Sequence, residues 1–231
     1  MLDQLLWVIN NITGTGELYC HKVIKKLPNL INCIYDRLQA INKVHLRILE
    51  NIAWTLGNIG YNNLIEKENY KNAFYLVADI LISNRTNKNQ SNTVADCLKV
   101  LKCLAKGFSD EESISLYASN NQLLEILIGI LSGNYGSFQI DDEGTYEHVV
   151  IFLGTILGSS DKKVVERLIL KGFCDKAAPL LFHQESPKTI VHTLWAYSNI
   201  AAMSEFIATI VLNKGLMQRI LNLAVDAKLL Q

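Results

Sequence analysis

The feature that most constrains the fold is a pair of residue types that recurs along the chain, a tryptophan followed by an asparagine four positions later. All 3 tryptophans of the 231-residue chain have this partner, in the pairs Trp7 and Asn11, Trp54 and Asn58, and Trp195 and Asn199. Aligning the chain on these pairs adds two equivalent positions, Lys99 and Ile151, and neighbouring equivalent positions are 44 to 52 residues apart. Periods of about 40–47 residues are typical of proteins built from two or three helices per repeat. The sequence therefore predicts an array of helical repeats.

The alignment divides the chain into repeats. The third helix of a partial repeat comes first, four complete repeats follow, and a second partial repeat ends the array, with boundaries at 1–15, 16–60, 61–108, 109–159, 160–203 and 204–231. We expect Pro28 to open a second helix and Gly60 to end a third, because proline suits a first helical turn and glycine a helix end. Ser186 and Pro187 are expected to start a third helix. The middle repeats are longer because they carry polar segments, around 84–93 and 133–144, which we expect to form loops.

The order of elements within a repeat indicates the fold class. A short first helix, a second helix and a longer third helix, with glycine before the next repeat, is the armadillo pattern, whereas two-helix repeats lack the short first helix. We therefore expect an all-α protein, a right-handed armadillo-type superhelical solenoid of three-helix repeats. The array begins with a third helix and stops after a second one, and solenoids need polar caps. We expect the chain to be a segment of a longer protein, or other subunits to cover both open ends of the solenoid.

Composition argues against several classes of function. The formal net charge is 0, so no basic surface for nucleic acid is expected. No apolar stretch is long enough to span a bilayer, and no basic segment followed by an apolar run resembles a secretory signal, so we expect no membrane partner and a location in the cytoplasm or nucleus. The 5 cysteines are scattered without zinc spacing, which predicts reduced core thiols and no metal. Motifs for nucleotide binding or nucleophilic catalysis are missing; we expect no cofactor, no catalytic residue and no enzyme.

The recurring pair suggests how such an array would bind a ligand. Residues four apart lie on one face of a helix. The third helices of an armadillo stack line a concave groove, and at about 8–10 Å between helices each repeat would meet two to three residues of an extended peptide. An asparagine amide can bind the donor and the acceptor of a peptide backbone, and indoles can flank a long cationic side chain. The predicted peptide-binding residues are Trp7, Asn11, Trp54, Asn58, Trp195 and Asn199.

The segments WVINNITG, WTLGNIG and WAYSNIA resemble the W-x-x-x-N-I signature of importin-alpha, the nuclear import adaptor. The resemblance in repeats covers essentially the whole chain. It implies a non-enzymatic adaptor that recognises nuclear localisation signals in its concave groove. In that family, tryptophan–asparagine repeats form a major site, weaker repeats follow, and the pair returns at a minor site. The order here is similar, with Lys99/Cys103 and Ile151/Thr155 in the middle repeats.

The chain also departs from that family. An aspartate that pairs with a lysine of the signal follows the groove asparagine there, but the corresponding positions are Thr15 and Asn62 here. Lys99 would add a positive charge to the groove. A groove that holds another extended segment, less dependent on lysine, is therefore also open. The alternative function is a structural armadillo scaffold subunit of a large assembly, such as a ciliary or cytoskeletal complex, located in the cilium or cytoskeleton.

Overall fold

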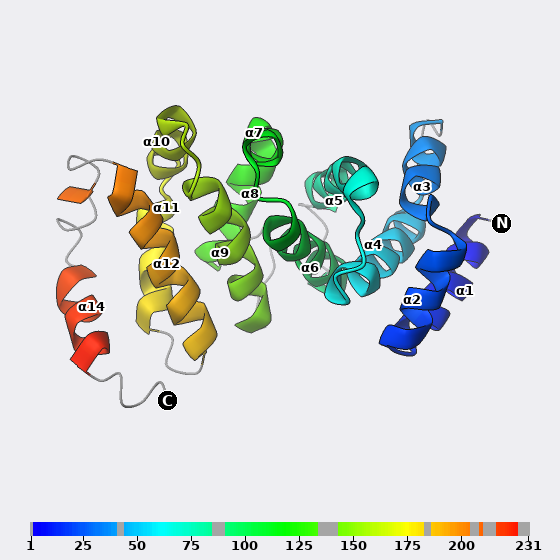
Figure 1. Ribbon diagram of the computed structural model, residues 1–231, viewed down its shortest axis with the longest axis horizontal. Helices are drawn as coiled ribbons and strands as arrows, with labels where there is room; N and C mark the ends of the chain where they lie inside the picture. Colours follow the sequence, from blue (N-terminus) through cyan, green and yellow to red (C-terminus); the bar gives the residue numbers. More distant parts are fainter. Residues whose placement is uncertain are drawn as a thin grey trace. The chain divides into compact units, whose positions relative to one another are not determined.

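The computed structural model describes residues 2–40, 44–84, 91–133, 143–182, 186–203, 208–209 and 216–225. Every regular element in these ranges is a helix (Figure 1), which confirms the all-α class. None of the described helices has both the length and the apolar character needed to cross a membrane. The helices belong to two compact units, the first containing α1 to α6 and the second α7 to α14.

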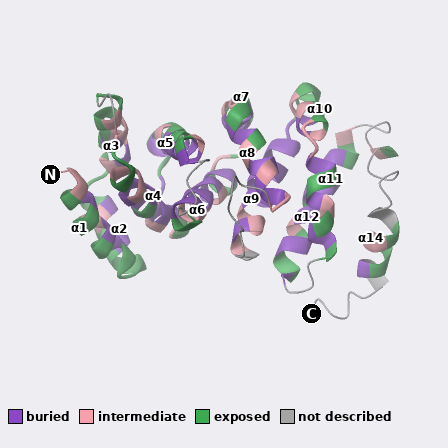
Figure 2. Cartoon of the chain, turned by 180° about the vertical axis from the view of Figure 1, so that it is seen from behind, coloured by how far each residue is buried: buried purple, intermediate pink, exposed green. Residues whose placement is uncertain are grey.

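The first unit is built around α4, which packs against α1 on one side and α6 on the other, while α5 packs against α3 and α6. Figure 2 shows more of α4 and α6 buried than of α1 and α2, which expose much of their surface. Ile52, Leu56 and Leu98 are fully buried in this core. The elements are α1 (Leu2–Gly14), α2 (Glu17–Lys26), α3 (Leu30–Gln39), α4 (Leu46–Tyr61), the 3-10 helix η1 (Lys67–Asn69), α5 (Tyr70–Asn84) and α6 (Ser91–Gly107).

The second unit is built around the pairing of α9 with α12. Residues 149–157 of α9 are all buried, and α12 contributes Ala196, Tyr197 and Ile200 to the same core. The Tyr197 hydroxyl donates a hydrogen bond of 2.6 Å to the Cys174 carbonyl, which ties α12 to α11. The elements are α7 (Glu111–Ser119), α8 (Asn121–Leu131), α9 (Glu143–Leu157), α10 (Lys162–Leu170), α11 (Phe173–Ala177), η2 (Ala178–Phe182), α12 (Pro187–Met203) and α14 (Leu216–Val225).

Two of the three expected helix ends differ in detail from the structure. Pro28 lies in the turn before α3, which begins at Leu30, and its carbonyl accepts a hydrogen bond of 3.2 Å from Asn69 Nδ2. Gly60 does not end α4, which continues to Tyr61. A Cβ at Gly60 would lie 3.1 Å from Val100 Cα, so this glycine permits α6 to approach closely. Pro187 is the first residue of α12, as expected.

Two of the predicted repeats are less regular than the three-helix pattern. In 61–108 the first helix is reduced to the single turn η1, because Tyr70 is buried against Phe108, with ring centroids 4.8 Å apart, and already belongs to the next helix. In 160–203 the second helix is split into α11 and η2, and Pro179, which lacks an N–H donor, stands at the break. Most of the predicted loops, at 85–90 and 134–142, lies outside the described residues, as does much of 204–231.

Candidate functional site

The three tryptophans project from α1, α4 and α12 and remain partly exposed. The exposed fraction is 54% for Trp7, 38% for Trp54 and 39% for Trp195. The buried faces of the same helices are formed by other residues, such as Leu6 on α1, Ile52 on α4 and Ile200 on α12. The structure therefore places each indole at the margin of its helix–helix interface. Trp7 and Trp54 lie on neighbouring helices of the first unit, and Trp195 lies in the second.

Two of the indoles rest on a glycine of the preceding third helix. A Cβ built at Gly154 of α9 would lie 2.6 Å from Cζ3 and 2.9 Å from Cε3 of Trp195. A Cβ at Gly14 of α1 would lie 4.0 Å from Cζ2 of Trp54. Because no side chain stands between ring and backbone, the indole lies across the neighbouring helix. The sequence signal for this contact is a glycine near the end of the previous third helix.

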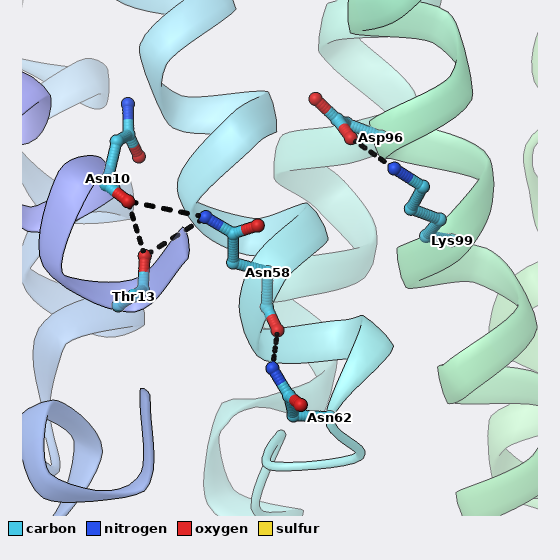
Figure 3. Close-up of polar contacts among 6 residues, drawn as sticks. All are labelled: Asn10, Thr13, Asn58, Asn62, Asp96 and Lys99. Atoms are coloured by element: carbon cyan, nitrogen blue, oxygen red, sulfur yellow. Dashed lines mark hydrogen bonds and ion pairs between the residues drawn. The ribbon is translucent and has the colours of Figure 1, made fainter. Parts of the chain in front are cut away.

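The asparagine of each motif already uses its amide nitrogen within the chain. Asn58 Nδ2 donates to Thr13 Oγ1 at 3.1 Å and to the Asn10 carbonyl at 3.5 Å (Figure 3). Asn199 Nδ2 donates to the Gly154 carbonyl at 3.0 Å. Asn11 Nδ2 donates to the carbonyl of Trp7, at 2.9 Å, on its own exposed helix face. Asn58 and Asn199 thus join their helix to the preceding third helix.

The Asn58 contact belongs to a polar network between α1 and α4 that the sequence reading missed. Asn10 is fully buried, donates to Asn51 Oδ1 at 3.1 Å and accepts from the Thr55 hydroxyl. Asn51 Nδ2 in turn donates to Asp3 Oδ1 at 2.6 Å. The available signal was that asparagine and threonine occupy the apolar stripe of both helices, where leucine or isoleucine would be expected. Such a network favours one pairing of the two helices because every buried polar group needs its partner.

In the middle repeats, the pairs Lys99/Cys103 and Ile151/Thr155 stand at the positions of tryptophan and asparagine. Neither pair offers an uncompensated charge to a ligand. Lys99 Nζ lies 2.8 Å from Asp96 Oδ1, so its positive charge is compensated (Figure 3). Burial raises the pKa of the Asp96 carboxyl, and the hydrogen bond and charge of Lys99 oppose that change. Burial also raises the pKa of the Cys103 thiol to about 11, which keeps it protonated at neutral pH. Ile151 and Thr155 are buried in α9, and the Thr155 hydroxyl donates to the Ile151 carbonyl at 3.0 Å.

Thr15 and Asn62, each four residues after a motif asparagine, share a role at a helix end. Thr15 Oγ1 donates to the Asn11 carbonyl at 2.7 Å, and Asn62 Nδ2 donates to the Asn58 carbonyl at 2.8 Å. Carbonyls in the last turn of a helix have few intrahelical partners, and each side chain bonds one of them. The Asn58 carbonyl also accepts from the backbone N–H of Asn62, at 3.3 Å. The side chains therefore complete the ends of α1 and α4, and neither offers a negative charge to a ligand.

The remaining titratable residues do not form a metal site in the described ranges. No group of three histidine, cysteine, aspartate or glutamate side chains there could hold a metal ion. All five cysteines lie in these ranges as free thiols, and only Cys33 is exposed. Burial raises the pKa of the Cys20 and Cys97 thiols. His192 Nε2 on α12 lies 3.8 Å from Glu147 Oε1 on α9 and so links the same two helices as Asn199.

Comparison with known proteins adds information about the fold. No protein-family model matches the sequence, and no curated protein matches it. Among solved structures, 21 chains match. One of these is the crystal structure of an engineered protein from the Northeast Structural Genomics Consortium, with a TM-score of 0.65 and 18% sequence identity over 96% of this chain and 83% of that chain. At such low identity the similarity shows a shared helical fold and no shared function.

Proposed function

We propose that this chain is a non-enzymatic scaffold of the armadillo type that binds an extended peptide along its third helices. The observation that carries the proposal is the partial exposure of all three indoles, 38% to 54%, at the same position of a repeating motif. Large apolar side chains left at the surface mark interaction sites, and tryptophan is enriched where binding energy concentrates. The binding residues proposed are Trp7, Asn11, Trp54, Asn58, Trp195 and Asn199.

The superhelical arrangement is part of this proposal. Its support is the order of α2, α3 and α4, a short, a second and a longer third helix, and the packing of α4 against α1 and α6 on opposite sides. In a right-handed armadillo superhelix of three-helix repeats, contacts of this kind place third helices next to one another. Small-angle scattering from the purified chain should then indicate an elongated, curved particle. A scattering curve of a sphere would contradict this arrangement.

In the first unit, two of the proposed binding tryptophans lie on helices that pack against each other. Trp7 and Trp54 lie on packed helices, and Asn58 follows Trp54 by one turn. A peptide across both helices would bury indole surface, at about 25 cal/mol per Å² of apolar area. Capture of a nuclear localisation signal is the version of this function that the importin-alpha resemblance implies. That version loses about 1.5–3 kcal/mol for each missing carboxylate–lysine hydrogen bond.

A titration with a basic nuclear-signal peptide tests the proposal. Isothermal calorimetry on the whole chain should detect binding that both Trp7→Ala and Trp54→Ala weaken at least about tenfold, the effect of removing about 1.4 kcal/mol. Leu170→Ala is the control, because Leu170 is also an exposed apolar side chain but lies on α10 of the second unit. Binding that survives both tryptophan replacements would place the peptide elsewhere and refute the face proposed.

A second candidate function is a structural scaffold subunit of a large assembly, for example a ciliary or cytoskeletal complex. Two observations favour it: the amide nitrogens of Asn58 and Asn199 already have partners within the chain, and α1 and α2 expose several large apolar side chains. These are Leu5, Val8, Ile12, Leu18 and Tyr19. If they contact other subunits, Val8→Lys with Ile12→Lys should improve the solubility of the isolated chain and leave its helical circular dichroism unchanged. Unchanged solubility would count against this candidate.

A further inference from the structure

Asn58 offers a ligand one kind of polar group. Both hydrogens of its amide nitrogen are directed at α1, to Thr13 Oγ1 and the Asn10 carbonyl. Figure 3 shows Asn58 Oδ1 on the opposite side of the amide, away from those two residues. No hydrogen bond to this oxygen is formed by the described residues. The side chain therefore acts as an acceptor for a partner, and its complement is an N–H donor.

Two carboxylates near this face are compensated by ion pairs. Asp3 on α1 pairs with Arg47 on α4 at 3.4 Å and also accepts from Asn51. On α6, Lys99 pairs with Asp96. Asp96 packs close to α4, because a Cβ built at Gly57, one turn beyond Trp54, would lie 2.8 Å from Asp96 Cβ. The positions after each motif, Thr15 and Asn62, are uncharged, as described above. Among the described carboxylates near this face, Asp3 and Asp96 each have a cation beside them, and Glu50, one turn before Trp54, also has a partner.

We infer that the face formed by Trp7, Trp54 and Asn58 binds an uncharged, extended segment of a partner protein, with apolar or aromatic side chains and a free backbone N–H opposite Asn58 Oδ1. This inference rests on the proposed function, because it names the chemical class of the peptide held at the same face. Charge complementarity selects the occupant: a neutral surface gains nothing from a charged side chain, which loses hydration on binding. Affinity comes from burying the two indoles, and the N–H bond sets the register.

Three matched peptides of about ten residues with blocked ends test this class, a length that crosses two helices at about 3.3 Å per residue. The first carries only apolar and neutral side chains, and the others replace two of its apolar positions by lysine or by glutamate. Calorimetry at about 50 and 500 mM salt should show the neutral peptide binding at least about tenfold more tightly than either charged one. Its Kd should change less than about twofold with salt, because the neutral peptide carries no charge that could pair with the protein.

Methylation of single backbone nitrogens in the neutral peptide tests the Asn58 contact. One methylation should weaken binding about fivefold to tenfold, the effect of losing one hydrogen bond, while those at nitrogens facing solvent leave the affinity unchanged. Equal affinities for the whole methylated series would refute the acceptor role of Asn58.

A pair of charge variants tests whether the Lys99–Asp96 ion pair controls the preference for an uncharged peptide. Lys99→Gln leaves the mostly buried Asp96 carboxylate without its cation, and the lysine peptide should then gain about threefold in affinity. The double variant Lys99→Gln with Asp96→Asn restores neutrality and should return the preference to the neutral peptide. Circular dichroism of both variants checks that the chain is folded. If Lys99→Gln leaves lysine-peptide affinity unchanged, charge compensation does not control selectivity and the inference fails.

The outcomes separate this inference from the proposed function. Tighter, salt-sensitive binding of the lysine peptide, abolished by Trp54→Ala, would overturn the neutral class and leave peptide binding at this face intact. Binding of no peptide, or binding insensitive to both tryptophan replacements, would overturn the proposed function itself. Sedimentation velocity tests whether a second copy of this chain binds at the face. A concentration-dependent dimer that Trp7→Ala abolishes would show that it does and would refute binding of a partner segment.

Discussion

The docking of α4 on α1 and of α12 on α9 uses the same motif in two different interfaces. In both pairs an indole lies on a glycine of the preceding third helix and an asparagine donates to that helix. Between α9 and α12 the fit is close, since a Cβ at Gly154 would meet Trp195 at 2.6 Å and one at Gly158 would meet Asn199 Nδ2 at 3.2 Å. Between α1 and α4, a Cβ at Gly14, the position equivalent to Gly158, would lie 3.4 Å from Asn58 Nδ2 and 4.0 Å from Trp54, and Asn10 stands at the position equivalent to Gly154.

The two interfaces also differ in polarity. Asn10, Asn51 and Thr55 are buried and bonded to one another between α1 and α4. The α9 side of the other interface is a run of buried, mainly apolar residues at 149–157. The motif therefore sets where the ring and the amide go, while the surrounding residues determine how the helices are held. Hydrogen bonds hold the first pair in register, and close apolar packing holds the second.

The largest effect is expected at the buried polar network. Asn10→Ala removes the amide that donates to Asn51 Oδ1 and leaves a cavity. The helix α1 should therefore lose about 3 kcal/mol of stability against local unfolding. Hydrogen exchange of α1 amides, read by mass spectrometry, measures that loss, and exchange in α12 of the second unit should not change. Thr15→Ala is the control, because the Thr15 hydroxyl bonds only the exposed Asn11 carbonyl at the end of α1. If protection in α1 survives Asn10→Ala, the network does not hold this interface.

The close apolar contact predicts the next largest effect. In Gly154→Ala the new methyl group overlaps the Trp195 ring, which costs about 1–3 kcal/mol, while alanine regains about 1 kcal/mol of helix propensity. The ring is partly exposed and can move outward, so the net loss should be about 1 kcal/mol. The emission of Trp195, isolated in a background of Trp7→Phe and Trp54→Phe, should shift to longer wavelength. An unshifted spectrum with unchanged stability would mean that the α9–α12 interface is packed as loosely as the α1–α4 interface.

The helical content and the partial exposure of the indoles could be expected from sequence, because period, apolar rhythm and helix-end residues are local signals. The direction of the asparagine amides could not. A side chain at that position can reach a ligand or a neighbouring helix, and the choice depends on interhelical distance, which glycines on another helix control. Pattern also failed at η1, where the burial of Tyr70 overrides the short helix expected in 61–108. The network at Asn10 was visible only as polar residues misplaced on an apolar stripe.

A smaller effect should separate the three motif asparagines. Asn58→Ala and Asn199→Ala each lose a bond to another helix, whereas Asn11→Ala loses a bond within its own exposed helix. All three gain similar helix propensity, so the first two should be about 1 kcal/mol less stable than Asn11→Ala in urea unfolding. Equal stabilities would show that the interhelical bonds are replaced by water without loss. In that case these amides would be available to a peptide backbone.

The smallest effect, and one of opposite sign, is expected at Gly14. A methyl group there would be at ordinary contact distance from Asn58 Nδ2 and Trp54, and Gly14 is the last residue of α1. Alanine restricts the unfolded chain, so Gly14→Ala should raise the stability of the first unit by about 0.5 kcal/mol, measured as slower hydrogen exchange in α1. Gly154→Ala makes the same chemical change at the glycine beneath Trp195, one turn earlier in the repeat, and should do the reverse. If both replacements destabilise to the same extent, α4 docks as closely as α12, and the contrast between a bonded interface and a packed one fails.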